Sequence, residues 1–180
     1  AVACALRPDG HDGARTRTLL MVRRAVDELG LRAEEVLLGE VSEDSRSVGL
    51  GSFAEVLANV RVVVTAQPSR WEGDSRTWEA LAAGAAVMTD PTWSLVDHPL
   101  EDGEHVLYFA VDSSEEAYVA FRDRLRRLLE DDEDAGWAMA QRGRAFALAH
   151  HRPVARMDTL LRRWVHAATG SPPASCAQSA

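Results

Sequence analysis

The chain has 180 residues, of which 46% are hydrophobic and 27% charged, and its formal net charge is −8. This composition is typical of a globular domain with a full hydrophobic core, and the acidic balance disfavours a surface that binds nucleic acid or anionic membranes. No apolar run approaches the roughly 20 residues that a membrane-spanning helix needs, so no transmembrane segment is predicted.

Apolar runs alternate with helical patterns in the first part of the chain. A buried strand is predicted at residues 1–6 (AVACAL), and a helix at 15–30, where apolar side chains recur at helical spacing up to the terminating Gly30. A second short strand is predicted at 34–39 (EEVLLG), and a short helix at 52–60 (SFAEVLANV).

The same alternation continues through the middle of the chain. Residues 61–66 (RVVVTA) form a continuous β-branched run, which is typical of a strand covered on both faces. A helix is predicted at 75–83, and strands at 85–89 (AAVMT) and 105–110 (HVLYFA). Alternating strands and helices with continuously apolar strands predict an α/β fold, a Rossmann-like parallel sheet flanked by helices.

From Ser113 onwards the pattern becomes helical, which predicts a helical C-terminal segment. One helical face is marked by Tyr118, Phe121, Leu125 and Leu128, and another by Val154, Met157, Leu161, Trp164 and Ala168. The last residues, GSPPASCAQSA, have the composition of a disordered tail. We therefore expect one domain at residues 1–168 and a disordered tail at 169–180.

Residues 49–54 (GLGSFA) match the GxGxxA dinucleotide fingerprint, on which a nicotinamide-dependent oxidoreductase could be built. That fingerprint has to follow an apolar strand, whereas the preceding SEDSRSV is polar. A glycine turn leading into a helix is therefore the favoured interpretation.

No pattern predicts a metal site. Residues 131–134 (DDED) lie where a helix begins, and acidic residues there stabilise the positive end of the helix dipole by about 0.3–1 kcal/mol each. The histidines come in two pairs, His98 with His105 and His150 with His151, and neither pair has the i, i+4 spacing of a helical metal site. We expect them to cap helices as cations or to be exposed.

The loop after the third predicted strand, QPSRWEGD (67–74), lies where open parallel sheets bind ligands. All 20 basic residues of the chain are arginines, so an anion must be held by arginine, backbone N–H groups or a helix N-terminus. Asp74 or Ser75 can cap the following helix, Gly73 permits a tight turn, and Arg76 adds a charge-assisted hydrogen bond. Together these residues predict a pyrophosphate cradle.

Glu79 falls one helical turn after Ser75. A carboxylate there is poorly suited to phosphate but well suited to accepting hydrogen bonds from a pair of sugar hydroxyls. A capped helix with an Arg–Glu surface pair explains the same residues, and the residue types alone leave both interpretations open.

Residues 68–91 (PSRWEGDSRTWEALAAGAAVMTDP) resemble the nucleotide-sugar-binding signature of GT-B glycosyltransferases, in particular the group 1 domain of spore-maturation-type proteins. The shared pattern is R-x-x-E-A-L-A-x-G-A followed by a strand that ends in Thr-Asp. Two further segments, 98–109 and 142–162, agree with the resemblance in the same order. It covers roughly residues 53–165.

The resemblance implies the carboxyl-terminal half of a two-domain enzyme with no metal and no cofactor, the donor being a nucleotide-diphosphate sugar. By position, Arg76 would face the diphosphate and Glu79 the ribose hydroxyls, while Arg70 and Glu72 would lie at the cleft near phosphate and donor sugar. Many GT-B enzymes have two glutamates with seven residues between them, whereas six residues lie between Glu72 and Glu79. Of the basic residues on the first loops, only Arg7 is a candidate.

We therefore interpret the chain as the donor-binding half of a glycosyltransferase. Because the chain starts at Ala1 rather than at a methionine, we expect it to be a piece of a longer protein. Its expected partners are the nucleotide-sugar donor, a carbohydrate or glycan acceptor and an amino-terminal half of the same protein, which would supply the general base in an inverting enzyme. A non-catalytic carbohydrate- or nucleotide-binding module is the main alternative, and an NAD-dependent oxidoreductase a lesser one.

Overall fold

The structure, a computed structural model, describes residues 2–5, 13–32, 36–39, 57, 59–67, 74–93, 97–131 and 133–170. Its elements in chain order are β1 (Val2–Ala5), α1 (Ala14–Glu28), β2 (Val36–Gly39), β3 (Val62–Val64), α3 (Ser75–Ala83), β4 (Ala86–Thr89), β5 (Leu107–Tyr108), α4 (Glu115–Arg126), the π-helical segment η3 (Arg127–Asp131), α5 (Glu133–His150) and α6 (Pro153–Thr169).

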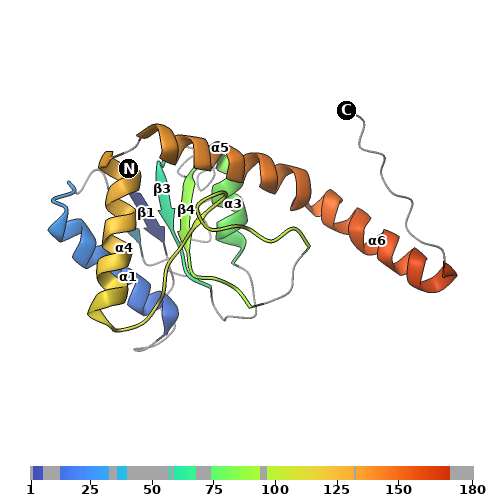
Figure 1. Cartoon of the computed structure of the whole chain (residues 1–180), viewed down its shortest axis with the longest axis horizontal. Helices are drawn as coiled ribbons and strands as arrows, with labels where there is room; N and C mark the ends of the chain where they lie inside the picture. Colours follow the sequence, from blue (N-terminus) through green and yellow to red (C-terminus); the bar gives the residue numbers. More distant parts are fainter. Residues whose placement is uncertain are drawn as a thin grey trace.

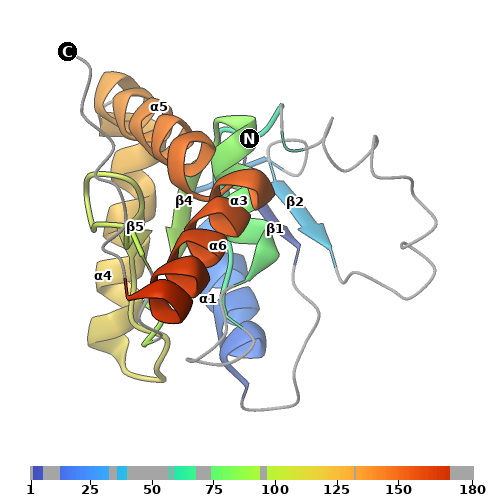
Figure 2. The same ribbon diagram turned by 90° about the vertical axis from the view of Figure 1, so that its right-hand side faces the viewer.

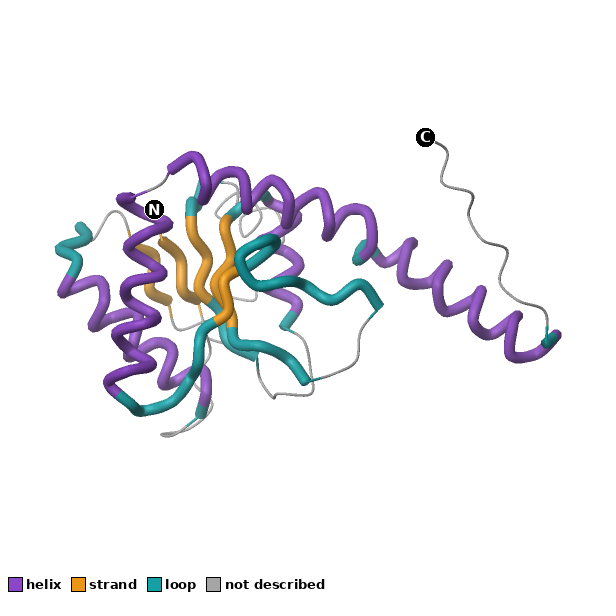
Figure 3. Tube along the Cα trace, viewed as in Figure 1, coloured by secondary structure: helices purple, strands orange, loops and turns teal. Residues whose placement is uncertain are grey.

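The strands form one parallel sheet of five in the order β2-β1-β3-β4-β5, with β2 and β5 at opposite edges (Figure 2). In register, Ala3 pairs with Val63, and Val63 pairs with Val87. Parallel neighbours need crossover connections, and helices lie on both sides of the central strands (Figure 3). The predicted fold, a Rossmann-like parallel sheet flanked by helices, is confirmed.

Each face of the sheet has its own hydrophobic layer. Val62 and Val64 belong to the cluster that includes Phe121 of α4, whereas Val63 belongs to the cluster that includes Leu81 of α3. All three valines are at most 5% exposed. Burial on both faces is why this strand is continuously apolar rather than alternating.

Helix α3 has the bounds that the sequence predicts, because both of its ends carry strong local signals. Asp74 is the N-cap, and its side chain accepts a hydrogen bond from the N–H of Arg76. Gly84 ends the helix with φ 91°, in the left-handed region that favours glycine. Leu81 and Ala80 are fully buried against the sheet side of the helix.

Strand β5 is shorter than the predicted 105–110. The residues before it form a turn, in which His105 N–H donates to the carbonyl oxygen of Glu101 at 3.1 Å. Gly103 occupies this turn with φ 77°. His105 and Val106, the first residues of the predicted strand, belong to this turn or end it, and only Leu107 and Tyr108 pair with β4.

Helix α6 continues beyond α5 and extends away from the body of the domain (Figure 1). The apolar face predicted from the sequence is present, but none of the residues of α6 is buried. Its large exposed side chains are Val154, Met157, Leu160, Leu161, Trp164 and Val165. The helix ends at Thr169, and residues 171–180, most of the predicted tail, lie outside the described residues.

No helix among the described residues combines the length and apolar character needed to cross a membrane.

Candidate functional site

A pocket of about 600 Å³ opens at the carboxyl ends of β3 and β4. We call it the carboxyl-end pocket. Its lining residues are Gln67, Asp74, Ser75, Thr77, Trp78, Thr89, Asp90, Pro91, Thr92, Pro99, Leu100, Tyr108 and Arg156. They come from the ends of two adjacent parallel strands, from the first turn of α3, from β5 and the segment before it, and from α6. This is the edge of an open parallel sheet at which ligands bind.

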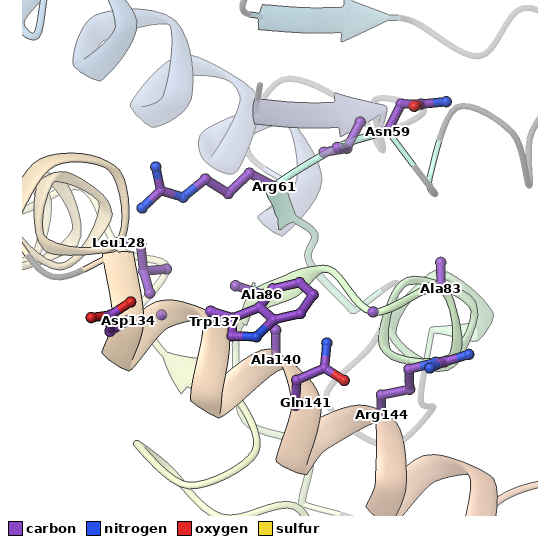
Figure 4. A pocket seen from close by; sticks show the side chains of 13 residues that line it. Asn59, Arg61, Ala83, Ala86, Leu128, Asp134, Trp137, Ala140, Gln141 and Arg144 are labelled. Carbon is purple, nitrogen blue, oxygen red and sulfur yellow. The ribbon is translucent and has the colours of Figure 1, made fainter.

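A second pocket, of about 790 Å³, lies at the opposite edge, where β3 and β4 begin. We call it the amino-end pocket. Figure 4 shows Trp137 in this pocket, with Arg61 above Trp137 and Arg144 below Trp137 in that view. Each arginine donates to a backbone carbonyl, Arg61 to Leu129 at 3.1 Å and Arg144 to Ala82 at 3.1 Å. The C-terminal, negative end of α3 also borders this pocket, so it is the less suitable of the two for a diphosphate.

Asp74 is the centre of a buried polar network. Its carboxylate is 4% exposed. One carboxylate oxygen accepts a hydrogen bond from Thr65 Oγ1 at 2.9 Å and lies 3.4 Å from Arg15 Nη2. The other oxygen accepts from the N–H of Arg76 at 3.2 Å and lies 3.4 Å from Arg76 Nη1. The predicted capping role of Asp74 is therefore confirmed, while Ser75 is the first residue of the helix and is exposed.

Gln67 ties the ends of the two strands to this cap. Its N–H donates to Asp90 Oδ1 at 2.8 Å, and its side-chain amide donates to Thr89 Oγ1 at 3.2 Å. Its side-chain oxygen, Oε1, accepts from the N–H of Asp74. All four residues, which form the pocket floor, are buried, and their polar groups are satisfied and held in fixed positions. The hydroxyl of Thr77, which also lines the pocket, is buried without a hydrogen-bond partner among the described residues.

The network limits what the tip of α3 can offer an anion. Asp74 already occupies the N–H of Arg76 with its side chain and that of Thr77 with its main-chain carbonyl, the latter at 3.1 Å. A phosphate at this tip would also face the Asp74 carboxylate. Guanidinium groups must therefore contribute most of the attraction for a diphosphate.

The predicted site residues are placed as follows. Asp74 and Ser75 line the carboxyl-end pocket. Arg76 and Glu79 are not among its lining residues; Arg76 lies against Asp74, and Glu79 is exposed on α3. Their assigned contacts with diphosphate and ribose stay predictions. Outside the described residues lie Arg7, Arg70, Trp71, Glu72, Gly73 and the GLGSFA stretch.

His150 and His151 depart from the expectation of cationic capping or plain exposure, whereas His98 is exposed, as expected. The rings of His98 and His150 stack with their centroids 4.0 Å apart, and those of Trp78 and His151 stack at 3.8 Å. Burial lowers the pKa of His150, and the neighbouring histidines lower it further. Burial also lowers the pKa of His151, with a further decrease from Arg156 and an opposing increase from the hydrogen bond with the His98 backbone. The two are therefore held as neutral rings in an aromatic cluster, contrary to the expected cationic role.

Sequence reasoning also missed Arg15 and Arg156. Arg15 is 15% exposed, and its Nε donates to the carbonyl oxygen of Ala66 at 3.3 Å, directly after β3. Arg156 reaches the pocket from α6. Among the described residues, no three His, Cys, Asp or Glu side chains are grouped so that they could hold a metal ion.

Residues 17–162 match the family described as glycosyl transferase-like. The chain belongs to this family. The match spans every element of the domain from α1 to α6 and includes both the Asp74 network and the carboxyl-end pocket. No curated protein matches the sequence at a significant level.

The chain is similar to several solved structures at low sequence identity, one of them with a TM-score above 0.5. One from the GtfA/B complex is 16% identical with a TM-score of 0.59, and the match covers 90% of this chain and 35% of that one. The C-terminal domain of a glycosyl transferase group 1 family protein from Francisella tularensis is 20% identical with a TM-score of 0.49, covering 73% and 61%. Sucrose-phosphate synthase from Thermosynechococcus elongatus is 21% identical with a TM-score of 0.48, covering 93% and 39%.

The matched region thus amounts to less than two thirds of each of these solved chains, at 61%, 35% and 39% of their lengths.

Proposed function

We propose that this glycosyltransferase chain is the donor-binding half of its enzyme and holds a nucleotide-diphosphate sugar in the carboxyl-end pocket. The observation that carries the proposal is the position of this pocket in a member of the family. It lies at the carboxyl ends of β3 and β4 and beside the N-terminus of α3. In open parallel sheets, nucleotides bind at this edge.

The chemistry required of this half is electrostatic. As a sugar leaves its nucleotide, negative charge develops on the departing diphosphate, and cations fixed near it lower the barrier. Arg76 would approach the diphosphate and Glu79 the ribose hydroxyls, with Arg70 and Glu72 near phosphate and donor sugar, as the resemblance to the spore-maturation-type group implies. The donor is a substrate, and this reading needs no metal and no further cofactor.

The exposed face of α6 supports the proposal of a second half. Met157, Leu161 and Trp164 are 54%, 55% and 70% exposed along one face of this helix. Apolar surface of this kind marks an interface. An amino-terminal half of the same protein would cover it and bring the acceptor glycan and a general base to the cleft, so residues 1–180 alone should bind donor but transfer little or no sugar.

Calorimetric titration of the chain with UDP-glucose, GDP-mannose and NAD tests the proposal. Binding of a nucleotide sugar without a response to NAD is expected. Tight binding of NAD with no response to either nucleotide sugar would instead favour the dinucleotide alternative. If the chain is a non-catalytic binding module, adding the amino-terminal half will restore no sugar transfer.

Variants at the site sharpen this test. Arg76→Ala should weaken nucleotide-diphosphate binding by roughly 1.5–3 kcal/mol, because a hydrogen bond to a charged group is lost. Glu79→Gln should weaken ribose-containing ligands more than free pyrophosphate. Arg144→Ala, in the amino-end pocket, is the matched control. If only Arg144→Ala weakens binding, the donor occupies the other pocket.

A further inference from the structure

Arg156 is the only basic residue among the described residues that line the carboxyl-end pocket. It belongs to α6, whereas the rest of the lining comes from the sheet edge, α3 and the segment before β5. Because the Asp74 carboxylate occupies the tip of α3 and already lies 3.4 Å from Arg76 Nη1, a diphosphate in this pocket needs a further cation, from another element. Arg156 is placed to supply it.

Two aromatic groups fix the guanidinium of Arg156. Its central carbon lies 5.0 Å from the centroid of the Trp78 ring, a cation–π distance. Its Nη2 lies 3.0 Å from Nδ1 of His151. Since a guanidinium has only donors, Nδ1 must be the unprotonated nitrogen of this imidazole.

The other side of the His151 ring is consistent with that assignment. Nε2 lies 2.9 Å from the carbonyl oxygen of His98, which can only accept. Nε2 therefore carries the proton, and His151 is held as one neutral tautomer between Arg156 and the segment that precedes β5. That segment continues into Pro99 and Leu100, which line the pocket.

We propose that Arg156 binds the diphosphate of the donor and that neutral His151 is the positioning residue that holds its guanidinium at the pocket. This inference rests on the proposed function and extends it to α6, which lies outside the central signature at residues 68–91. Arg163 of the same helix pairs with Asp97, which gives α6 a second attachment to the segment before β5.

The arrangement makes donor binding sensitive to pH. Protonation of His151 would place a second N–H against Nη2 of Arg156 and remove the acceptor. The charged or titratable groups that face His151 are His98, His150 of α5 and Arg156 of α6, while α3 contributes the uncharged ring of Trp78. Burial and the positive charge of Arg156 oppose protonation of His151, while its hydrogen bond to the His98 backbone favours it, and the pKa of His151 is lowered overall. The guanidinium should therefore be released when His151 does become protonated.

The first experiment measures binding by calorimetry at pH 8 with inorganic pyrophosphate, UDP-glucose and GDP-mannose. Arg156→Ala should raise the dissociation constant roughly 10- to 100-fold for whichever nucleotide sugar binds and for pyrophosphate, and leave the free nucleoside unaffected. Arg162→Ala is the matched control, because it removes the same charge from the same helix, where Arg162 pairs with Asp158. An unchanged dissociation constant in Arg156→Ala overturns the assignment.

The second experiment isolates His151 through the pH profile of nucleotide-sugar binding between pH 5.5 and 8. The diphosphate diester of a nucleotide sugar does not titrate in this range, unlike a terminal phosphate, whose second pKa is about 6. Wild-type affinity should be constant near pH 8 and fall only at pH values below 6.5, the ordinary pKa of histidine, because burial lowers the pKa of His151 from that value. Tighter binding at low pH would refute the positioning role.

Substitution at position 151 then separates positioning from packing. The amide of His151→Gln can accept from Arg156 and donate to His98 without titrating, so affinity at pH 8 should be retained and its loss at low pH abolished. His151→Phe keeps a ring beside Trp78 but no acceptor, so its binding should be weak at every pH. A pH dependence that persists in His151→Gln overturns the role of His151.

The outcomes for this inference and for the proposed function are distinct. If the wild-type chain binds neither pyrophosphate nor either nucleotide sugar, the proposed function fails, and the role of Arg156 with it. If the wild type binds and Arg156→Ala binds equally well while remaining folded by circular dichroism, only the present inference fails.

Discussion

Replacing Asp74 with alanine should destabilise the domain far more than the removal of an ordinary helix cap. The N-cap bond alone is worth about 1 kcal/mol. The same carboxylate, 4% exposed, also accepts from the Thr65 hydroxyl at 2.9 Å and lies 3.4 Å from Arg15, which is itself mostly buried. Hydrogen bonds to a charged group contribute about 1.5–3 kcal/mol each, and buried partners left unpaired add to the loss.

These contributions overlap, because all of them belong to one network, so we expect a total loss of roughly 2.5–4 kcal/mol rather than their full sum. Urea unfolding followed by circular dichroism measures the free energy of unfolding directly. Ser114→Ala is the matched control. Ser114 caps α4 through a 3.1 Å bond to the N–H of Ala117, but it is exposed and lies outside any buried network.

The control should therefore lose only about 0.5–1 kcal/mol. Equal losses in Asp74→Ala and Ser114→Ala would mean that the buried network adds nothing to the cap. In that case the view of the pocket floor as a rigid polar framework would be wrong. Asp74→Asn, which keeps an acceptor for the N–H of Arg76 but removes the charge, should fall between the two.

Two further predictions concern α5 and the histidines. A Cβ on Gly143 would lie 2.6 Å from a backbone carbonyl oxygen, so Gly143→Ala should lower the free energy of unfolding by about 1–3 kcal/mol. A Cβ on Gly136 would come no closer than 3.4 Å to its neighbours, so Gly136→Ala should be close to neutral. Urea unfolding of the two variants measures both values. Because the folded-state pKa values of His150 and His151 are lowered, their contribution to stability is complete above about pH 6.5 and decreases as the pH falls below it. Thermal unfolding from pH 8 to pH 5 should show this decrease in the wild type and a smaller one in a His150→Gln, His151→Gln double variant; an unchanged decrease would contradict it.

The parts of the fold that could be predicted are those specified by neighbouring residues. The bounds of α3 follow from an aspartate cap at one end and a glycine in the left-handed region at the other. Strand β3 follows from three consecutive valines that are buried on both faces. The length of β5 was predicted wrongly, although the dipeptide Asp102-Gly103 is a turn signal. The turn at Gly103 includes His105 and Val106, and it is held by backbone hydrogen bonds and by the bond from the N–H of Glu101 to Nδ1 of His105.

The site divides in the same way. Asp74 and Ser75 were predictable from their place before a helix, and Gln67 and Asp90 each directly follow a predicted strand, a signal that would have found them. Arg156 contacts the pocket only because α6 passes it, and nothing in its own neighbourhood indicates that contact.

The neutral state of His151 also depends on a distant residue. Its hydrogen-bond partner, the carbonyl of His98, is 53 residues away, so sequence spacing predicts a charged or exposed histidine.

Helix α6 connects the two proposals physically. One side of it presents Arg156 to the carboxyl-end pocket, and another presents the exposed apolar face that includes Met157 and Trp164. A second half packed on that face would restrict the position of α6 and so reduce the entropy lost when Arg156 binds a diphosphate. Linkage then requires the converse, that bound donor strengthens the association of the two halves by the same factor. Donor affinity measured with and without the amino-terminal half should therefore differ in the wild type, and the difference should shrink in Arg156→Ala, because that variant severs the connection between the helix and the diphosphate.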